Sequence, residues 1–295
     1  MSDPRPPKAE REELADKILH WVSTRLYKGV GPDWARIDLT VRMAGGVEDY
    51  AYATVNQDGS AQEREFPSEI QRAFRDLRDL QYEEQTGTWF SARFTMDPPD
   101  FFKYRFNFDI DPVWDPPIGP EVWAKDLALY PRSEANIPRW LHKALDPEAE
   151  LPPVPPGGPV EHTTYAKHVE QQIWHTLPIG WTYTQVQFRE IGSHVETNAL
   201  VRDVAGRMYQ WAPPQAVTER FQELRASMAG PQTTWYSAKF EMQYSGEKKL
   251  TFNRTDEPQW VASPPSETYQ EELRRAGSLD ALPGWLRARV TEPGS

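Results

Sequence analysis

Three aspartates within seven residues are the side chains best placed to do chemistry in this chain. Asp109, Asp111 and Asp115 lie in the segment Phe-Asp-Ile-Asp-Pro-Val-Trp-Asp, at the end of a predicted strand, where we expect Asp109 on the polar face of the sheet beside Arg105. Carboxylates at a strand end can hold Mg²⁺ or act as general acid and base. The pattern is also typical of an acidic, solvated strand end. We favour this second interpretation, because the related stretch 254–260 does not repeat the spacing of the aspartates.

Histidine and cysteine offer little further chemistry. The chain has no cysteine, which excludes disulfides, thiolate metal sites and a cysteine nucleophile. His168 and His175 lie seven residues apart on a predicted helix, but no carboxylate at ligand spacing accompanies them. Neither a GxxxxGK[ST] phosphate loop nor a GxSxG nucleophile elbow occurs. We therefore expect a protein that is not an enzyme and holds no metal or cofactor.

Tryptophan is abundant, with 12 residues, and suggests binding rather than catalysis. Trp114 and Trp260 each follow a predicted hairpin beside a proline, which makes them candidates for partly exposed anchors of a partner. Trp89 lies on the polar phase of its strand. It is either an exposed contact or is covered by a closing segment that holds Trp140, and we favour the covered arrangement.

The aromatic residues recur because the chain contains two copies of one unit. Residues 88–127 align with 234–273 without a gap at an offset of 146, with thirteen identities. Unrelated segments of this length share roughly two or three identities, so the match indicates a duplicated domain. We predict a first repeat over 8–146, a proline-rich linker over 147–160 and a second repeat over 161–291.

Each repeat is predicted to be a sheet flanked by helices. Apolar residues four apart mark the opening helix, with Leu14, Ile18, Val22 and Leu26 on its buried face. The predicted helices and strands of the first copy, in chain order, cover 9–27, 37–43, 50–55, 68–80, 89–96, 103–110 and 120–129. Ser68 is the expected N-cap of the second helix. The fold class is α+β, with two tandem copies of a helix-flanked, antiparallel, meander-like sheet domain.

Charge and hydropathy limit the partners. The chain has 33 basic and 44 acidic residues, a net charge of −11, and residues 1–150 alone hold 19 basic and 28 acidic residues. Such a surface excludes general nucleic-acid binding and suits a basic protein, although the charge also serves solubility. The sequence has no apolar run long enough to span a membrane. Its polar N-terminus lacks a signal core, so we expect a cytoplasmic protein.

The order of aromatic residues and turns resembles a known family. The segments Gly-Thr-Trp-Phe-Ser-Ala-Arg-Phe, Tyr-Arg-Phe-Asn-Phe-Asp, Pro-Val-Trp and Leu-Tyr-Pro-Arg-Ser-Glu-Ala-Asn-Ile-Pro-Arg-Trp-Leu are similar to those of the YezG-like immunity proteins of bacterial polymorphic toxin systems. The resemblance covers chiefly 66–141, and more weakly 214–286. The usual member is a single domain, so the duplication departs from the family. The second copy also lacks Tyr-Pro-Arg at 130–132 and most of the acidic loop.

The resemblance implies a small cytoplasmic α+β protein that binds and neutralises a cognate toxin domain. We expect a basic toxin, and we expect the first copy to bind it, because that copy carries the net charge. The predicted partner-binding residues are the acidic and aromatic side chains that follow the hairpin, namely Asp109, Asp111, Trp114, Asp115, Glu121 and Trp123.

Two other functions remain open from the sequence. One is an uncharacterised enzyme or small-molecule-binding protein with a carboxylate-lined cleft between the repeats. The other is an adaptor whose proline-rich run at 151–159 is a ligand for an SH3-type domain, although the position of that run between repeats already explains it as a linker.

Overall fold

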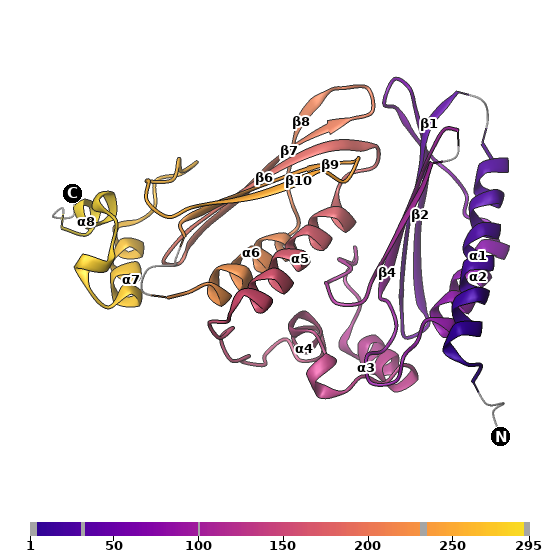
Figure 1. The fold of residues 1–295 in the computed structure, drawn as a ribbon, viewed down its shortest axis with the longest axis horizontal. Coiled ribbons are helices and arrows are strands. Elements are labelled where there is room, and N and C mark those ends of the chain that lie inside the picture. Colours follow the sequence, from indigo (N-terminus) through magenta and orange to yellow (C-terminus); the bar gives the residue numbers. More distant parts are fainter. Residues whose placement is uncertain (1–4, 31–32, 100, 231–234, 292–295) are drawn as a thin grey trace. The chain divides into compact units, whose positions relative to one another are not determined.

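Two five-stranded antiparallel sheets organise the chain, one in each half (Figure 1). The structure is a computed structural model that describes residues 5–30, 33–99, 101–230 and 235–291. The chain divides between Leu151 and Pro152 into two units, here called unit 1 and unit 2. The α+β class with two helix-flanked antiparallel sheets confirms the predicted fold class. None of the described helices is long and apolar enough to cross a bilayer.

Unit 1 has the strand order β3-β2-β1-β4-β5 in its sheet. Its elements are α1 (Lys8–Lys28), β1 (Trp34–Ala44), β2 (Val47–Asn56), β3 (Ala61–Glu63), α2 (Ser68–Leu80), β4 (Ser91–Asp97), β5 (Phe101–Asn107), α3 (Pro120–Leu129), a 3₁₀ turn (Glu134–Asn136) and α4 (Arg139–Leu145). Helices α1 and α2 cover one face of this sheet, and α3 and α4 close one end of it (Figure 1).

Unit 2 repeats the same succession with the strand order β10-β9-β6-β7-β8. Its elements are α5 (Pro159–Thr176), β6 (Trp181–Ile191), β7 (His194–Asp203), β8 (Met208–Trp211), α6 (Gln215–Ser227), β9 (Ser237–Gln243), β10 (Lys248–Asn253), α7 (Ser266–Ala276), a 3₁₀ turn (Leu279–Ala281) and α8 (Gly284–Thr291). The third strand of each sheet, β3 or β8, is short and was not predicted, because three or four residues are too few to show a period of two.

The main core of unit 1 lies between the helices and the sheet. Val22 and Leu26 of α1, with Phe74 and Leu77 of α2, are at most 2% exposed and pack on β1 and β4. The prediction that Leu14 belongs to this face was wrong, because Leu14 is 37% exposed. Helix α1 turns its Ala15–Leu19–Val22–Leu26 stripe to the sheet, which leaves the neighbouring stripe through Leu14 outside.

A second, smaller core explains the recurrent tryptophans at the end of each unit. Trp140 of α4 packs on Phe90 at 4.9 Å and on Trp123 of α3 at 5.2 Å between ring centroids. Trp89 is fully buried, as we expected, but what covers it differs from the prediction. Its neighbours are Phe74 of α2 and Phe106 of β5, not Trp140.

A buried ion pair in unit 1 joins two helices, the segment before β4 and the β1–β2 turn. Arg78 of α2 donates to both carboxylate oxygens of Asp126 of α3 at 2.8 and 2.9 Å, and its Nε donates to the Trp89 carbonyl at 3.0 Å. Asp126 Oδ1 also accepts from the Gly45 N–H in the β1–β2 turn, at 2.7 Å. Both side chains of the ion pair are at most 5% exposed, so every charge is balanced within the protein.

Unit 2 contains the same arrangement of a buried arginine and a carboxylate, here called the clamp, with a glutamate in place of the aspartate. Arg225 of α6 donates to the Trp235 carbonyl at 2.9 Å and to Glu272 of α7 at 3.1 Å. Glu272 accepts from the Gly192 N–H at 3.2 Å. A second carboxylate, Glu190, also accepts from Arg225, at 2.7 Å. The clamp is therefore a feature of the duplicated fold rather than of one copy.

Two local predictions are corrected by the backbone. Helix α2 has Pro67 at its N-cap and no side-chain cap bond, so Ser68 is the first helical residue and not the cap. Strand β5 ends at Asn107 instead of continuing to residue 110. The Asn107 side-chain oxygen accepts from the N–H groups of Asp109 and Ile110 and folds the chain into a bend, and Asn253 does the same in unit 2. Asp109 therefore lies outside the sheet face on which we expected it.

Candidate functional site

The predicted acidic loop is held firmly against unit 1. Arg42 of β1 donates from Nε to the Pro112 carbonyl at 2.9 Å, and its Nη1 pairs with Asp49 of β2 at 2.6 Å. Asp111 Oδ1 accepts from the Val113 N–H at 2.8 Å, which shapes the turn. The Asp109 carbonyl accepts from Trp140 Nε1 at 2.9 Å. This loop is therefore an ordered platform and not a free strand end.

The six predicted partner-binding residues separate into an exposed and an inner group. Asp109, Asp115 and Glu121 are exposed, and Asp111 is half-buried. Trp114 is half-buried and packs on the small core of Phe90, Trp140 and Leu141. Trp123, the last of the six, is only 4% exposed and belongs to that same core. The loop therefore presents carboxylates but less aromatic surface than the sequence predicts, since its tryptophans mainly anchor α3 and α4.

Metal chemistry finds no support in this loop. Across the described part of the chain, no group of three or more histidine, aspartate or glutamate side chains is arranged to hold a metal ion. The exposed carboxylates instead act as local charge. Glu121 lies in the first turn of α3, where a negative side chain interacts favourably with the helix dipole.

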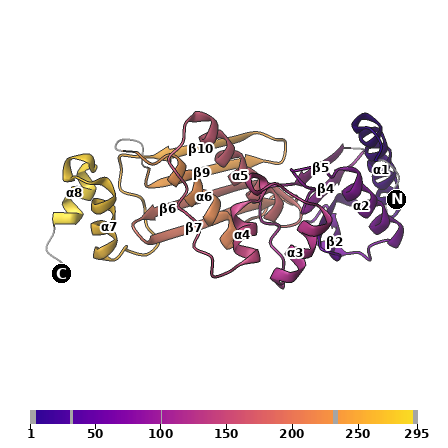
Figure 2. The same ribbon diagram turned by 90° about the horizontal axis from the view of Figure 1, so that it is seen from below.

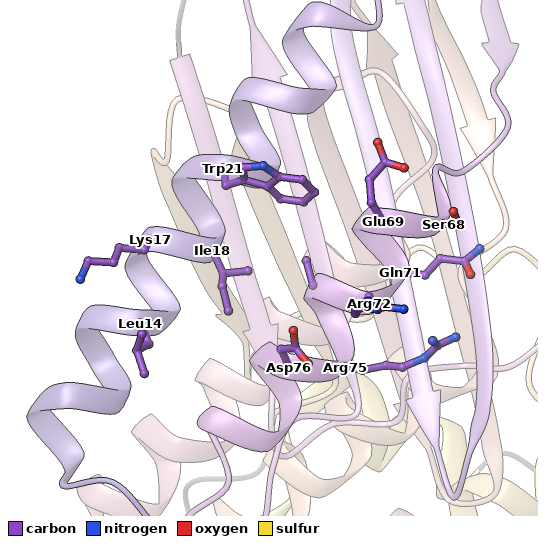
Figure 3. A pocket seen from close by; sticks show the side chains of 11 residues that line it. Leu14, Lys17, Ile18, Trp21, Ser68, Glu69, Gln71, Arg72, Arg75 and Asp76 are labelled. Carbon is purple, nitrogen blue, oxygen red and sulfur yellow. The ribbon is translucent and has the colours of Figure 1, made fainter.

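An apolar recess of unit 1 lies elsewhere, between α1 and α2 (Figure 3). Leu14, Ile18 and Trp21 of α1 face Ala73 of α2 across a groove of about 730 Å³. Trp21 is 43% exposed. Positions 14, 18 and 21 form one stripe of the helix, next to the stripe that packs on the sheet. An indole exposed in a groove is the type of side chain that dominates protein interfaces.

Charged side chains surround this groove and are mostly paired. Arg75 donates to both carboxylate oxygens of Glu48 at 2.6 and 2.8 Å, and this hydrogen bonding holds the pKa of Glu48 below its usual range. Arg25 pairs with Glu69 at 2.7 Å. Arg75 and Glu69 at the rim are thus held in ion pairs. Leu14, Ile18 and Trp21 give the groove its apolar wall (Figure 3).

Trp21 was not among the predicted partner-binding residues, although the sequence carries a signal for it. Leu14, Ile18 and Trp21 add a second apolar stripe to one that already runs through Val22 and Leu26. This apolar surface of α1 is wider than the part that packing on one sheet can cover, so some of its side chains must remain exposed to solvent or to a partner. When Val22 is aligned with Ile173, the residue at the position of Trp21 in the second copy is glutamine. The exposed tryptophan thus belongs to unit 1 alone.

Comparison with known proteins gives no identification. No protein-family model matches this chain, and no curated protein matches it.

Proposed function

We propose that this protein is an immunity protein that binds and neutralises a cognate bacterial toxin domain, mainly through unit 1. The observation that carries the proposal is the exposed Trp21 in the apolar groove between α1 and α2. Protein interfaces gain most of their binding energy from a few aromatic anchors in recesses with polar rims. This groove has that composition and lies in the copy that we expected to bind.

The charge of unit 1 defines the kind of partner. Residues 1–150 hold 19 basic and 28 acidic residues, and the exposed Asp109, Asp115 and Glu121 add a local negative surface. A basic toxin domain is attracted by such a surface, and the attraction weakens with salt. The resemblance to YezG-like immunity proteins supports the same function. In this proposal Trp123 stabilises the fold, and Trp21 replaces it as the aromatic contact.

Purification of the tagged full-length chain from its source cells tests the proposal. At moderate salt we expect one basic toxin domain to remain bound in stoichiometric amount and to be released at high salt. The same tag on a Trp21→Ala chain serves as the matched control and should retain much less of it. A purified chain that carries no protein, or an acidic protein that resists high salt, contradicts the proposal.

A further inference from the structure

A second recess of unit 1 lies on the other flank of α1, against the edge of the sheet. It has a volume of about 540 Å³. Its apolar and aromatic walls are Leu19 and Tyr27 of α1, Met96, and Phe102 and Tyr104 of β5, and α1 also contributes polar side chains, Asp16 among them. Tyr27 is 49% exposed and Tyr104 is 42% exposed. The recess therefore opens between a helix and a strand, whereas the groove with Trp21 opens between two helices.

Strand β5 is the edge strand of this sheet. It pairs with β4 on one side, and no strand among the described residues pairs with its other side (Figure 2). An edge strand presents a row of backbone N–H and C=O groups that can template a further strand. An edge beside an apolar recess under a helix is the geometry in which extended peptides bind by strand addition.

We propose that β5 accepts an extended segment of a partner protein as an added strand, with alternating apolar and acidic side chains. The apolar side chains enter the recess beside Phe102 and Tyr104. The acidic side chains fall on the other face of the sheet, next to Lys103 and Arg105. This follows from the pleat, because neighbouring residues of a strand point to opposite faces.

The cations on β5 favour acidic side chains at alternate positions of the added strand. Lys103 and Arg105 lie on one face of β5, opposite Thr95 and Arg93 of β4. Burial lowers the pKa of Lys103, the positive charges of Arg105 and Arg36 lower it further, and Asp97 raises it. A carboxylate directly across the ladder from Lys103 or Arg105 places an opposite charge beside a cation, and such cross-strand pairs stabilise a strand pair.

In the registers centred on residues 103 to 105, the same charges disfavour a second copy of this chain as the occupant. Two β5 strands paired antiparallel about Tyr104 place Lys103 opposite Arg105, and pairing about either cation places it opposite itself. Like charges directly across a ladder are destabilising. A foreign segment with acidic residues at those places has no such conflict.

Unit 2 has an ion pair at the place that corresponds to this recess. In the β9–β10 pair, Lys248 stands opposite Met242, as Phe102 stands opposite Met96 in unit 1. Lys248 forms an ion pair with Glu170 of α5, across the boundary between helix and edge strand. The recess of unit 1 has apolar side chains where unit 2 has this ion pair. The site is independent of the proposed toxin groove and does not require it.

Selection from a display library of random decapeptides on the full-length chain tests the proposal. A Phe102→Lys chain, which carries the residue of unit 2 at this position, is the matched target, and circular dichroism checks its fold. We expect the enriched peptides to alternate apolar and acidic residues and to bind the Phe102→Lys chain at least tenfold more weakly. Enriched peptides without alternation, no enrichment, or equal binding to both chains overturns the proposal.

Two further measurements separate strand addition from other modes of binding. N-methylation of alternate amides on the pairing edge of the best peptide removes ladder hydrogen bonds, and we expect it to abolish binding. A Lys103→Glu/Arg105→Glu chain should prefer peptides with basic residues at the acidic positions. Retained binding after methylation, an unchanged charge preference, or a dimer of the free chain that Phe102→Lys dissociates contradicts the added foreign strand.

Discussion

At the residue scale, one arginine in each unit connects parts of the chain that are distant in sequence. Arg78 links α2 to α3 and to the Trp89 carbonyl just before β4, and Arg225 makes the corresponding links in unit 2. The carboxylate partners, Asp126 and Glu272, occupy equivalent positions of the two repeats, 146 residues apart. A buried charge keeps its partner because a lone charge in the interior is strongly unfavourable.

Removal of the carboxylate from the unit 1 clamp should therefore destabilise that unit. We expect Asp126→Ala to lower the free energy of unfolding by about 3–5 kcal/mol, because Arg78 is then buried without a counter-charge. Urea unfolding followed by tryptophan fluorescence measures this. Glu69→Gln, which breaks the exposed pair with Arg25, is the control and should leave the transition in place. Equal effects of the two substitutions contradict the role assigned to the clamp.

Glu196 should make the stability of unit 2 sensitive to acid. Burial alone raises the pKa of Glu196, but hydrogen bonds from the N–H groups of Ala262 and Val261, and from His194, hold it below its usual range. Because the folded pKa is depressed, the stabilisation is present at neutral pH and is lost as pH falls below the usual glutamate range. We expect Glu196→Gln to be less stable than the wild type at neutral pH and equal to it at strongly acidic pH. A stability difference that does not vary with pH contradicts this prediction.

At the scale of elements, the first hairpin turn is fixed by contact with α3. Gly45 has φ of +53°, and a Cβ there would lie 2.3 Å from the Val122 carbonyl oxygen. Gly46 has φ of +88°, but a Cβ there would meet only the flexible Lys125 amine, at 3.2 Å. Gly192 in unit 2 is hemmed in similarly, by Thr268. The turn and the closing helix are thus one packed element.

Substitution of the two neighbouring glycines separates backbone strain from crowding. We expect Gly46→Ala to cost about 1–2 kcal/mol of stability from its left-handed backbone alone. Gly45→Ala carries the same strain and also pushes α3 away, so its loss should be clearly larger. Denaturant unfolding of the two variants compares them. A Gly45→Ala loss no greater than that of Gly46→Ala shows that α3 adjusts freely to the turn.

Much of the element order followed from sequence because long periodic segments carry strong signals. The helices at α1 and α2 and the β4–β5 hairpin repeat apolar residues at periods of 3.6 and 2. The end of β5 did not follow, since Phe108 and Ile110 continue the strand pattern while the Asn107 side chain turns the backbone. We expected Trp123 to contact a partner, because the sequence shows a tryptophan in the acidic segment but does not show that Trp140 of α4 packs against it. The groove depends on how far α1 and α2 lie apart, which is set by tertiary packing.

At the scale of the whole molecule, the uneven charge predicts which unit attracts the partner. We expect amide substitution of exposed carboxylates in unit 1 to slow toxin association several-fold at low salt, with little change in dissociation. The variant is Asp109→Asn/Asp115→Asn/Glu121→Gln. The control removes the same charge from exposed positions of unit 2, as Asp256→Asn/Glu267→Gln/Asp280→Asn. Stopped-flow association rates that fall equally for both variants contradict a dominant role for unit 1.

The affinity of the purified toxin domain for a Trp21→Ala chain tests the central claim most directly. Isothermal titration should show a loss of about 2 kcal/mol or more, roughly 30-fold in Kd, because the indole is the aromatic anchor in the groove. Leu129→Ala, which truncates an exposed apolar side chain on α3, should leave Kd within about twofold. Unchanged affinity of the Trp21→Ala chain, with its fold intact, contradicts the proposal that this groove binds the toxin.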